Sequence, residues 1–351
     1  MSAEILRRLD EERAFWPRGR FHELALDYVP WDDLTGAETV DGRIDRALRN
    51  ETGCVPVIGP SGSGKSAAIA AAAQRLSDRF TCLRIPVAAV GDVAGSPVAL
   101  GQHILREAVQ QAELALVAHQ KRSLIEAAAD KLTRREPQQG VGGKLQVGIP
   151  GLSAEIGGDL KASGLDREEL VNATGVVQGL DRLVSIFTAR GREPVLIFED
   201  TDAWLSRTQS GQSADAANRF FADSLGVLVR DVDIRIVIAT HTAYIELEGY
   251  RSIRERLLTE VEIPSLDRPR DAIARILQKR IDVTTISASV GDVFADEGLA
   301  RLVAEYDHSH RSIRHVLNVC DTALEQAAPT YPDRLTEDHL RGASVALRGP
   351  V

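Results

Sequence analysis

Five short apolar runs, separated by stretches with helical spacing, dominate the pattern of hydrophobic and polar positions along the chain. The runs are 54–58, 80–87, 194–198, 234–239 and 260–264. Continuous apolar runs of this length are typical of strands buried on both faces. Strands that alternate with helices form parallel βαβ units. The pattern therefore predicts an α/β fold, in which a parallel sheet forms the middle of three layers.

Helical spacing recurs between these runs and continues alone after the last one. The predicted helices before the last run are 2–13, 42–50, 67–76, 96–116, 121–135, 170–190, 218–230 and 253–258. Beyond Ser265 there is no strand pattern, only helices punctuated by proline and glycine. We expect an N-terminal extension (1–26), an α/β domain (27–264) and a C-terminal helical lid domain (265–351).

A different pattern interrupts the α/β domain at about 140–164. Leu145, Val147 and Ile149 alternate with polar or small residues, and apolar residues alternate again after Pro150-Gly151. Alternation on both sides of a turn signal predicts a β-hairpin inserted into the domain.

Composition limits the classes of protein that this chain can belong to. The chain has 351 residues, a net charge of -9 and three cysteines that are far apart in the sequence. The spacing argues against a zinc site or a disulfide framework, and the acidic balance excludes a surface that is basic throughout. The sequence has no apolar stretch long enough to span a membrane, and residues 1–10 lack the apolar core of a signal peptide. We expect a cytoplasmic protein.

The segment 59–66 fits the phosphate-binding pattern G-x-x-x-x-G-K-[ST] at every position. A chance match in a Gly/Ser-rich turn is the alternative, but a predicted strand precedes the segment and a predicted helix follows it. We expect Lys65 to reach the β- and γ-phosphates of a nucleotide and Ser66 to bind Mg²⁺. The predicted nucleotide-binding residues here are Gly59, Pro60, Ser61, Gly62, Ser63, Gly64, Lys65, Ser66 and Ala67.

Two acidic residues follow the apolar run 194–198, where parallel strands place ligand-binding side chains. Four apolar residues and then two acids is the Walker B arrangement. We expect Glu199 to hold Mg²⁺ through water and Asp200 to orient and polarise the attacking water. The alternative is an acidic turn after a core strand.

Five further residues, at three places in the sequence, are candidates for contact with the nucleotide. Thr240 and His241 follow the strand 234–239, where a polar side chain can touch the γ-phosphate or the attacking water; the alternative for His241 is a solvated loop residue. Arg314 lies on a predicted lid helix and can face the nucleotide. Arg254 and Arg256 precede the last strand, where an arginine could reach the nucleotide of a neighbouring subunit. Solvation on a helix surface explains either arginine equally well.

With these motifs the chain resembles an AAA+ ATPase of the initiator-type clade, which includes origin-recognition ATPases and ATPase regulators of DNA transposition. The resemblance covers about 28–343. It implies that Tyr28, Val29 and Pro30 pack on adenine, and that Thr240 and His241 stand at sensor 1. It also implies that Arg256 is an arginine finger and Arg314 is sensor 2.

The sequence departs from the pattern of that clade in three ways. Walker B usually ends Asp-Glu, whereas here it ends Glu199-Asp200, which shortens the side chain expected to polarise water. His241 replaces the usual sensor-1 asparagine. The DNA-binding winged-helix domain of origin-recognition members does not follow the lid.

We therefore expect an ATP-hydrolysing, magnesium-dependent switch that assembles with copies of itself or with partner proteins. DNA is a candidate partner by resemblance. A basic run at 121–144 adds little support for DNA binding, because acidic residues interleave with it and a solvated helix face explains it better. The alternative function is a nucleotide-binding scaffold with little turnover, a signalling module of the kind found in bacterial conflict systems. There the hairpin at 140–164 would dock a protein.

Overall fold

The structure is a computed structural model, and it describes residues 2–17, 19–89, 95–111, 167–199, 201–202 and 212–348. The predicted hairpin at 140–164, the predicted helix at 121–135 and Asp200 lie outside these residues.

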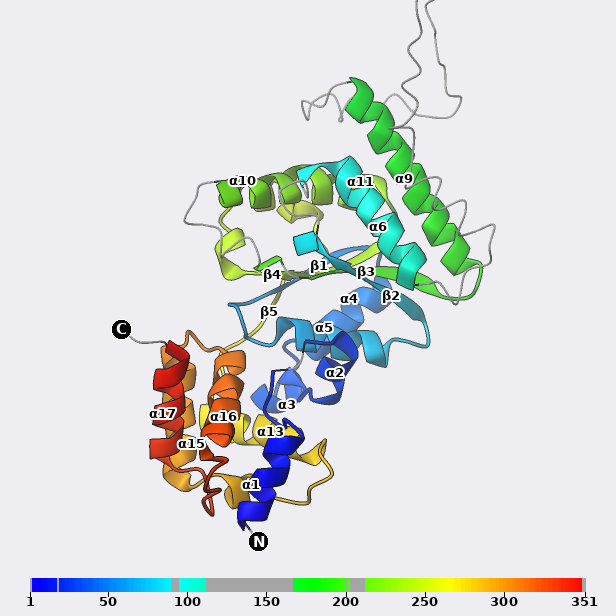
Figure 1. The fold of residues 1–351 in the computed structure, drawn as a ribbon. Coiled ribbons are helices and arrows are strands. Elements are labelled where there is room, and N and C mark those ends of the chain that lie inside the picture. Colours follow the sequence, from blue (N-terminus) through cyan, green and yellow to red (C-terminus); the bar gives the residue numbers. More distant parts are fainter. Residues whose placement is uncertain are drawn as a thin grey trace, which may run out of the picture.

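A five-stranded parallel sheet forms the centre of the α/β domain (Figure 1). Its strands are β1 (Gly53–Ile58), β2 (Phe80–Pro86), β3 (Glu193–Glu199), β4 (Arg235–Thr240) and β5 (Val261–Glu262), in the order β2-β3-β4-β1-β5. β1 pairs with β4 from Gly53↔Arg235 to Ile58↔Thr240, so their carboxyl ends meet at one edge of the sheet. The predicted α/β class is confirmed.

Helices cover both faces of the sheet because successive strand residues point to opposite faces. In β3, Val195 and Ile197 pack into one hydrophobic core, and Leu196 and Phe198 pack into the other. The first face carries α4 (Asp41–Asn50), α5 (Lys65–Arg75) and α2 (Phe21–Leu26). The second carries α6 (Pro97–Gln111), α9 (Arg167–Thr188), α10 (Gln212–Arg219) and α11 (Gly226–Asp231), with a π-helical segment at Phe220–Leu225 between the last two.

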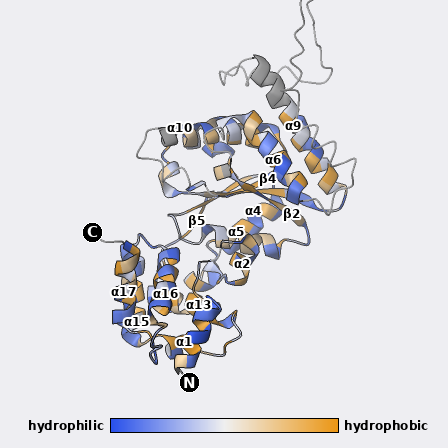
Figure 2. Cartoon of the chain, viewed as in Figure 1, coloured by the Kyte–Doolittle hydropathy of each residue, from blue (hydrophilic) through white to orange (hydrophobic). Residues whose placement is uncertain are grey.

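The residues after the sheet form a separate group of helices beside it (Figure 1). They are α13 (Pro269–Asp282), α14 (Val290–Val293), α15 (Asp296–His308), α16 (Ile313–Ala327) and α17 (Glu337–Arg348). Figure 2 shows both hydrophobic and hydrophilic residues on these helices, and many of their apolar residues, such as Leu277, Leu302 and Leu324, are buried. We call this group the lid.

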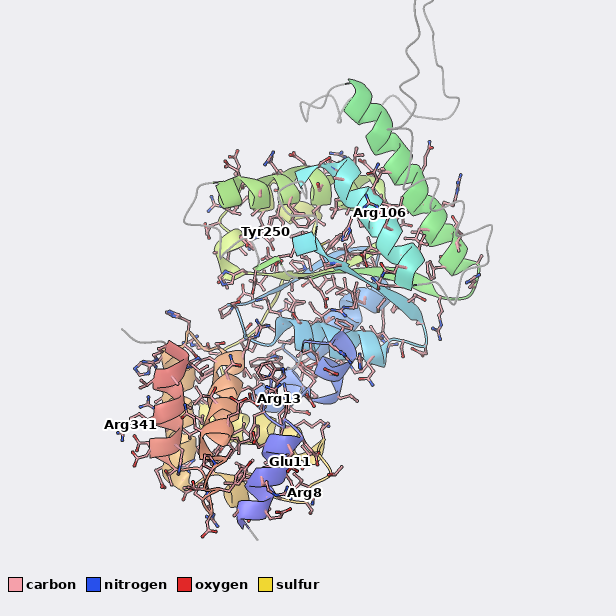
Figure 3. All side chains as sticks on the ribbon, in the orientation of Figure 1. Arg8, Glu11, Arg13, Arg106, Tyr250 and Arg341 are labelled. Atoms are coloured by element: carbon pink, nitrogen blue, oxygen red, sulfur yellow. The ribbon has the colours of Figure 1, made fainter. Side chains whose placement is uncertain are left out.

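The N-terminal extension packs against the lid and then crosses to the sheet domain. Leu6 and Leu9 of α1 (Ser2–Glu11) are fully buried, and the Phe15 ring lies 5.5 Å from the ring of Phe294 in the lid. Figure 3 shows the labelled side chains of α1 beside the lid helices. Further along, α2 packs on α5, the helix that follows the phosphate-binding segment. The extension therefore joins the two parts of the molecule.

The structure shifts some predicted boundaries and adds elements. The helix predicted at 253–258 lies earlier, as α12 (Glu248–Ile253), and is followed by a 3₁₀ turn at Arg254–Arg256. The strand predicted at 260–264 is only Val261–Glu262, because β5 pairs only with the last two residues of β1. The short helices α2 and α3 (Trp31–Thr35) were not predicted. Among the described helices, none has the length and apolar character that crossing a membrane requires.

Candidate active site

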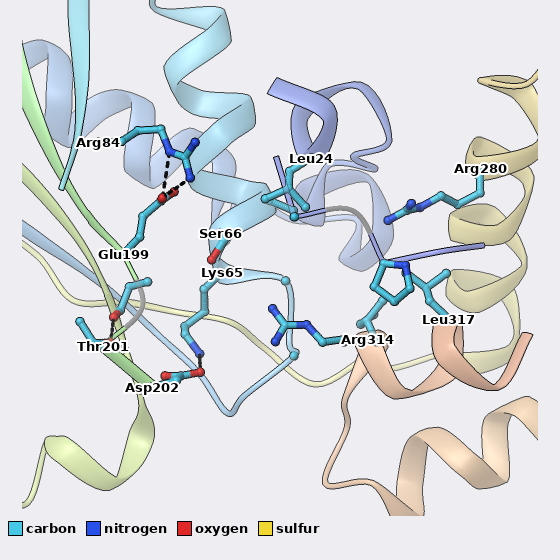
Figure 4. Close-up of a pocket in the computed structure, with 17 residues that line it drawn as sticks. Leu24, Lys65, Ser66, Arg84, Glu199, Thr201, Asp202, Arg280, Arg314 and Leu317 are labelled. Atoms are coloured by element: carbon cyan, nitrogen blue, oxygen red, sulfur yellow. Dashed lines mark hydrogen bonds and ion pairs between the residues drawn. The ribbon is translucent and has the colours of Figure 1, made fainter. Parts of the chain in front are cut away.

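A cavity of about 300 Å³ lies where the phosphate-binding segment, the carboxyl ends of the strands and the lid meet (Figure 4). Its lining includes Lys65 and Ser66 from the start of α5, Glu199 from the end of β3, and Arg314 from α16. Lys65 and Arg314 are more than 240 positions apart in the sequence, yet all four predicted site residues line the same cavity. Ala67, Gly62 and Gly64 also line it.

The phosphate-binding segment has the backbone that an anion site needs. Gly62 (φ 75°) and Gly64 (φ 101°) lie in the left-handed region, which glycine adopts without strain. Lys65 is 5% exposed, and its Nζ donates to the carbonyl oxygens of Gly59 and Pro60, both at 2.9 Å. Burial lowers the pKa of Lys65, with nearby Arg314 adding to the effect and Asp202 opposing it. An anion in the cavity would meet a cation fixed at the start of a helix.

The lid rests directly on this segment. The backbone N–H of Arg314 donates to the carbonyl oxygen of Gly62 at 3.1 Å. A Cβ atom added to Gly62 would lie only 2.2 Å from the Ser312 hydroxyl oxygen, so glycine permits the close approach. The Arg314 side chain points into the cavity (Figure 4). The lid arginine thus comes within reach of whatever the segment binds.

Glu199 points to the same face of the sheet as α5, since it continues the alternation of Val195 and Ile197. Its side chain is 8% exposed and is paired with Arg84 of the neighbouring strand β2. Arg84 donates from Nε and Nη2 to Oε2 of Glu199, at 2.9 and 2.5 Å (Figure 4). Glu199 is therefore held by an arginine that the sequence analysis missed. Asp200, its predicted partner, lies outside the described residues.

The oxygen atoms around the cavity fit a magnesium ion. The Ser66 hydroxyl and the Glu199 carboxylate line the same space, and Mg²⁺ prefers such oxygen ligands. Over the described ranges there is no group of three or more His, Cys, Asp or Glu side chains that could hold a metal by itself. Mg²⁺ commonly takes most of its ligands from substrate phosphates and water, so one hydroxyl and one carboxylate suit it.

Two residues directly after Walker B also belong to the site. Asp202 accepts a hydrogen bond from the Ser61 hydroxyl at 2.8 Å, and one of its oxygens lies 3.6 Å from Lys65 Nζ. Thr201 is buried, donates to the carbonyl oxygen of Ala239, and accepts from the Tyr244 hydroxyl at 2.8 Å. A third acid, three positions after Glu199, was the available sequence signal for Asp202.

Thr240 and His241 lie at the end of β4, beside the phosphate-binding segment. Thr240 is fully buried, and its carbonyl oxygen accepts from the backbone N–H of Gly59 at 3.1 Å. His241 uses Nδ1 to accept from the backbone N–H of Ala243 at 3.0 Å, and burial lowers its pKa. Neither residue lines the cavity. Their contact with a γ-phosphate stays a prediction.

Apolar residues make up another part of the cavity lining. They are Pro17, Gly19 and Leu24 of the extension and Ile313 and Leu317 of α16. None of them was predicted as a site residue.

The segment predicted to pack on adenine lies close by, but Tyr28, Val29 and Pro30 do not line the cavity. The Tyr28 hydroxyl donates to the Asp41 carboxylate at 2.9 Å, and burial raises the pKa of that hydroxyl. The contact of these three residues with a base stays a prediction.

The two arginines before β5 lie away from the cavity and differ from each other. Arg254 pairs with Glu260 at 2.7 Å. Arg256 is exposed and forms no hydrogen bond or ion pair with any residue in the part of the chain that the structure describes. Of the two, Arg256 is the one whose guanidinium remains available to another molecule.

Comparison with known proteins supports the fold. No curated protein matches the sequence. Among solved structures, the *Aeropyrum pernix* ORC1 protein in complex with DNA is similar in fold, with a TM-score of 0.51 and 14% identity over 93% of this chain and 69% of that one. The ADP form of the *A. pernix* ORC2 protein gives a TM-score of 0.51 and 14% identity, over 95% and 72%. The AAA ATPase domain model matches residues 35–223, more than half of the sequence. The chain therefore belongs to the AAA ATPase domain family.

Proposed function

We propose that this protein binds ATP with Mg²⁺ in the cavity between the sheet domain and the lid, hydrolyses it, and couples the nucleotide state to assembly. The observation that carries the proposal is the convergence of Lys65, Ser66, Glu199 and Arg314 on one space. Two of these come from the phosphate-binding segment, one from a strand end and one from the lid, so that chance proximity is a poor explanation.

The chemistry divides among the residues by charge and position. Lys65 and the backbone N–H groups at the start of α5 would bind the β- and γ-phosphates, and Ser66 and Glu199 would hold the magnesium ion. When bound, that ion neutralises charge that develops on the phosphate oxygens. Asp200 would orient the attacking water, and Arg314 would place a positive charge against the phosphates from the lid side.

Assembly is proposed from Arg256, which is exposed and without a partner among the described residues. An arginine supplied by a neighbouring subunit stabilises transition-state charge and makes hydrolysis depend on assembly. We propose a homo-oligomer, with partner proteins or DNA as further ligands. The similar ORC1 structure contains DNA, which makes DNA the first nucleic acid to test.

Slow basal turnover is the second candidate, and the Arg84–Glu199 pair favours it. Arg84 is paired with the carboxylate that is predicted to hold Mg²⁺, so this ion pair would have to rearrange before Glu199 could bind the ion. A protein that binds nucleotide tightly but turns it over only with a partner would act as a switch or scaffold.

The proposal is tested by measuring nucleotide binding and ATP hydrolysis with and without double-stranded DNA. Lys65→Ala should abolish both activities, and Asp200→Asn should retain binding but lose roughly 100-fold or more in turnover. Turnover that neither substitution changes would overturn the enzymatic assignment. If the unaltered protein binds ATP but hydrolyses it only slowly, the result would favour the scaffold.

Trans action of an arginine finger needs its own test. Arg256→Ala should bind ATP normally and turn it over at least roughly tenfold more slowly. Mixing it with Asp200→Asn protein should restore part of the activity, because intact sites form between unlike subunits. Arg254→Ala is the matched control, since Arg254 is already paired with Glu260. A protein that stays monomeric with ATP would contradict assembly.

A further inference from the structure

The N-terminal extension contacts both the lid and the sheet domain. On the lid side, the Glu12 carboxylate accepts from the backbone N–H of Thr285 at 3.0 Å, and Phe15 packs on Phe294. On the sheet side, α2 packs on α5, and the Phe21 ring lies 4.9 Å from the Arg84 guanidinium. We call residues 19–27 the linking segment. It includes α2 and connects the part of the extension that packs on the lid to the sheet domain.

A buried ion pair fastens the linking segment to the lid. Asp27, the last residue of the segment, lies 2.8 Å from Nη1 of Arg280 on α13. The two side chains are only 2% and 7% exposed. Arg280 also donates to the Trp16 carbonyl oxygen at 3.1 Å. Removing one member of such a pair leaves the other charge buried without compensation, so the two residues act as a unit.

The pair stands at the end of the cavity that is farthest from Lys65. Arg280 lines the cavity with Leu24 of the linking segment and Leu317 of the lid (Figure 4). A nucleotide whose phosphates lie at Lys65 would extend toward these residues. Separation of the lid from the linking segment would widen the cavity at this end and ease the exit of the nucleotide.

Two hydrogen bonds that join the lid to the sheet domain are weaker than this ion pair. Arg314 donates one backbone hydrogen bond to Gly62, and Arg275 donates one exposed hydrogen bond to the Asp33 carbonyl oxygen at 2.8 Å. Single hydrogen bonds near solvent exchange readily with water, whereas separating Asp27 from Arg280 exposes two charges at once.

We propose that the Asp27–Arg280 pair is a latch that sets how fast bound nucleotide leaves. It positions the lid and does not react with the substrate. The inference rests on the proposed nucleotide site and adds its control of exchange.

The test measures release of a fluorescent ADP, labelled on the ribose, after mixing with excess unlabelled ADP. The variants are Asp27→Asn, Arg280→Gln and their combination. We expect each single variant to release the nucleotide roughly tenfold faster, because either one disables the latch. The double variant should be no faster than the faster single variant. Association should also accelerate, so that the Kd changes by less than about threefold, since a latch governs entry and exit alike.

A matched control removes a partly buried arginine that lies entirely inside the lid. Arg301 pairs with the buried Glu305, and Arg301→Gln should leave the release rate within about twofold of the unaltered protein. If the neutral variants do not fold, Arg280→Lys keeps the charge and should release nucleotide roughly two- to fivefold faster, because it loses the planar guanidinium geometry.

Three outcomes would overturn the latch. The folded variants could release ADP at the rate of the unaltered protein, or the rate increases of the two single variants could multiply in the double variant. ADP could also associate more slowly with the variants, which would show a direct contact with the base. Failure of the unaltered protein to bind ADP would instead refute the proposed function. Binding with a release rate insensitive to all these variants refutes the latch alone.

Discussion

The two ends of the cavity are built in different ways. At the phosphate end, Lys65 and Ser66 belong to one continuous segment, and Glu199 joins them from the carboxyl end of β3. At the opposite end, Leu24, Arg280 and Leu317 come from the extension and two lid helices, nearly 300 positions apart. One end is set by local backbone geometry and the other by long-range packing.

This difference assigns separate tasks to the two ends. The phosphate end is part of the sheet domain, so its geometry should persist whatever the lid does. The other end exists only while the lid, the extension and α2 remain together. We expect the first end to determine whether nucleotide binds, and the second to determine which nucleotide binds and for how long.

Gly62→Ala should produce the largest effect, because it damages the contact between the phosphate end and the lid. The new Cβ would collide with Ser312 and force an unfavourable φ. We expect ATP affinity to fall roughly 100-fold, measured by calorimetric titration. Gly36→Ala is the matched control, because Gly36 has a similar φ of 73° but open space around it. Equal losses of affinity in both variants would mean that only backbone strain matters.

Leu317→Ala should distinguish the two ends. It removes an apolar side chain that lines the far end and should weaken ATP binding roughly tenfold. Inorganic triphosphate lacks a base and ribose, so its affinity should not change. Both ligands are compared by competition against a fluorescent nucleotide. Equal weakening of both would show that Leu317 supports the phosphate end as well.

Arg84→Gln should give a smaller effect, confined to the phosphate end. Without the guanidinium, Glu199 is free to serve the metal, so the Mg²⁺ concentration at half-maximal nucleotide binding should fall roughly threefold. Arg79→Gln, directly before the same strand but paired with Glu193, is the control and should have no effect. A higher Mg²⁺ requirement in Arg84→Gln would show that Arg84 helps the ion to bind.

The same division separates the features of the fold and site that the sequence could predict from those that it could not. The five strands and the phosphate-binding segment were predictable, because buried strands are apolar throughout and the segment has a fixed glycine and lysine spacing. Arg84 was not, because pairing it with Glu199 requires knowing that β2 lies beside β3. Leu24 and Arg280 were not, since only the packing of the extension on the lid brings them to the cavity. Short motifs determine local backbone geometry and can be recognised in the sequence. Contacts between residues that are far apart in the sequence depend on the tertiary fold.

The smallest predicted effect concerns the packing that holds the far end together. Burial, together with the negative charges of Glu325 and Asp10, raises the pKa of Asp321 on α16 to about 6, and Arg13 of the extension opposes the shift. The folded protein therefore binds this proton more tightly than the unfolded chain, in which the pKa is near 3.8. Between about pH 4 and pH 6 the contribution of Asp321 to stability should decrease as pH rises, and the full cost of its charge is present above pH 6.

Asp321→Asn isolates this contribution, because it removes the charge at every pH. At pH 7 the variant should unfold a few degrees higher than the unaltered protein, by roughly 1–3 °C in calorimetry, and the difference should vanish near pH 4. Glu325→Gln is the control: Glu325 is exposed, and its removal should give a smaller shift of the same sign. A variant that is less stable at pH 7 would show that the charged Asp321 is needed by Arg13, 3.8 Å away. In that case the extension would be held to the lid by charge as well as by Leu6, Leu9 and Phe15, and salt should loosen the far end of the cavity while leaving the phosphate end intact.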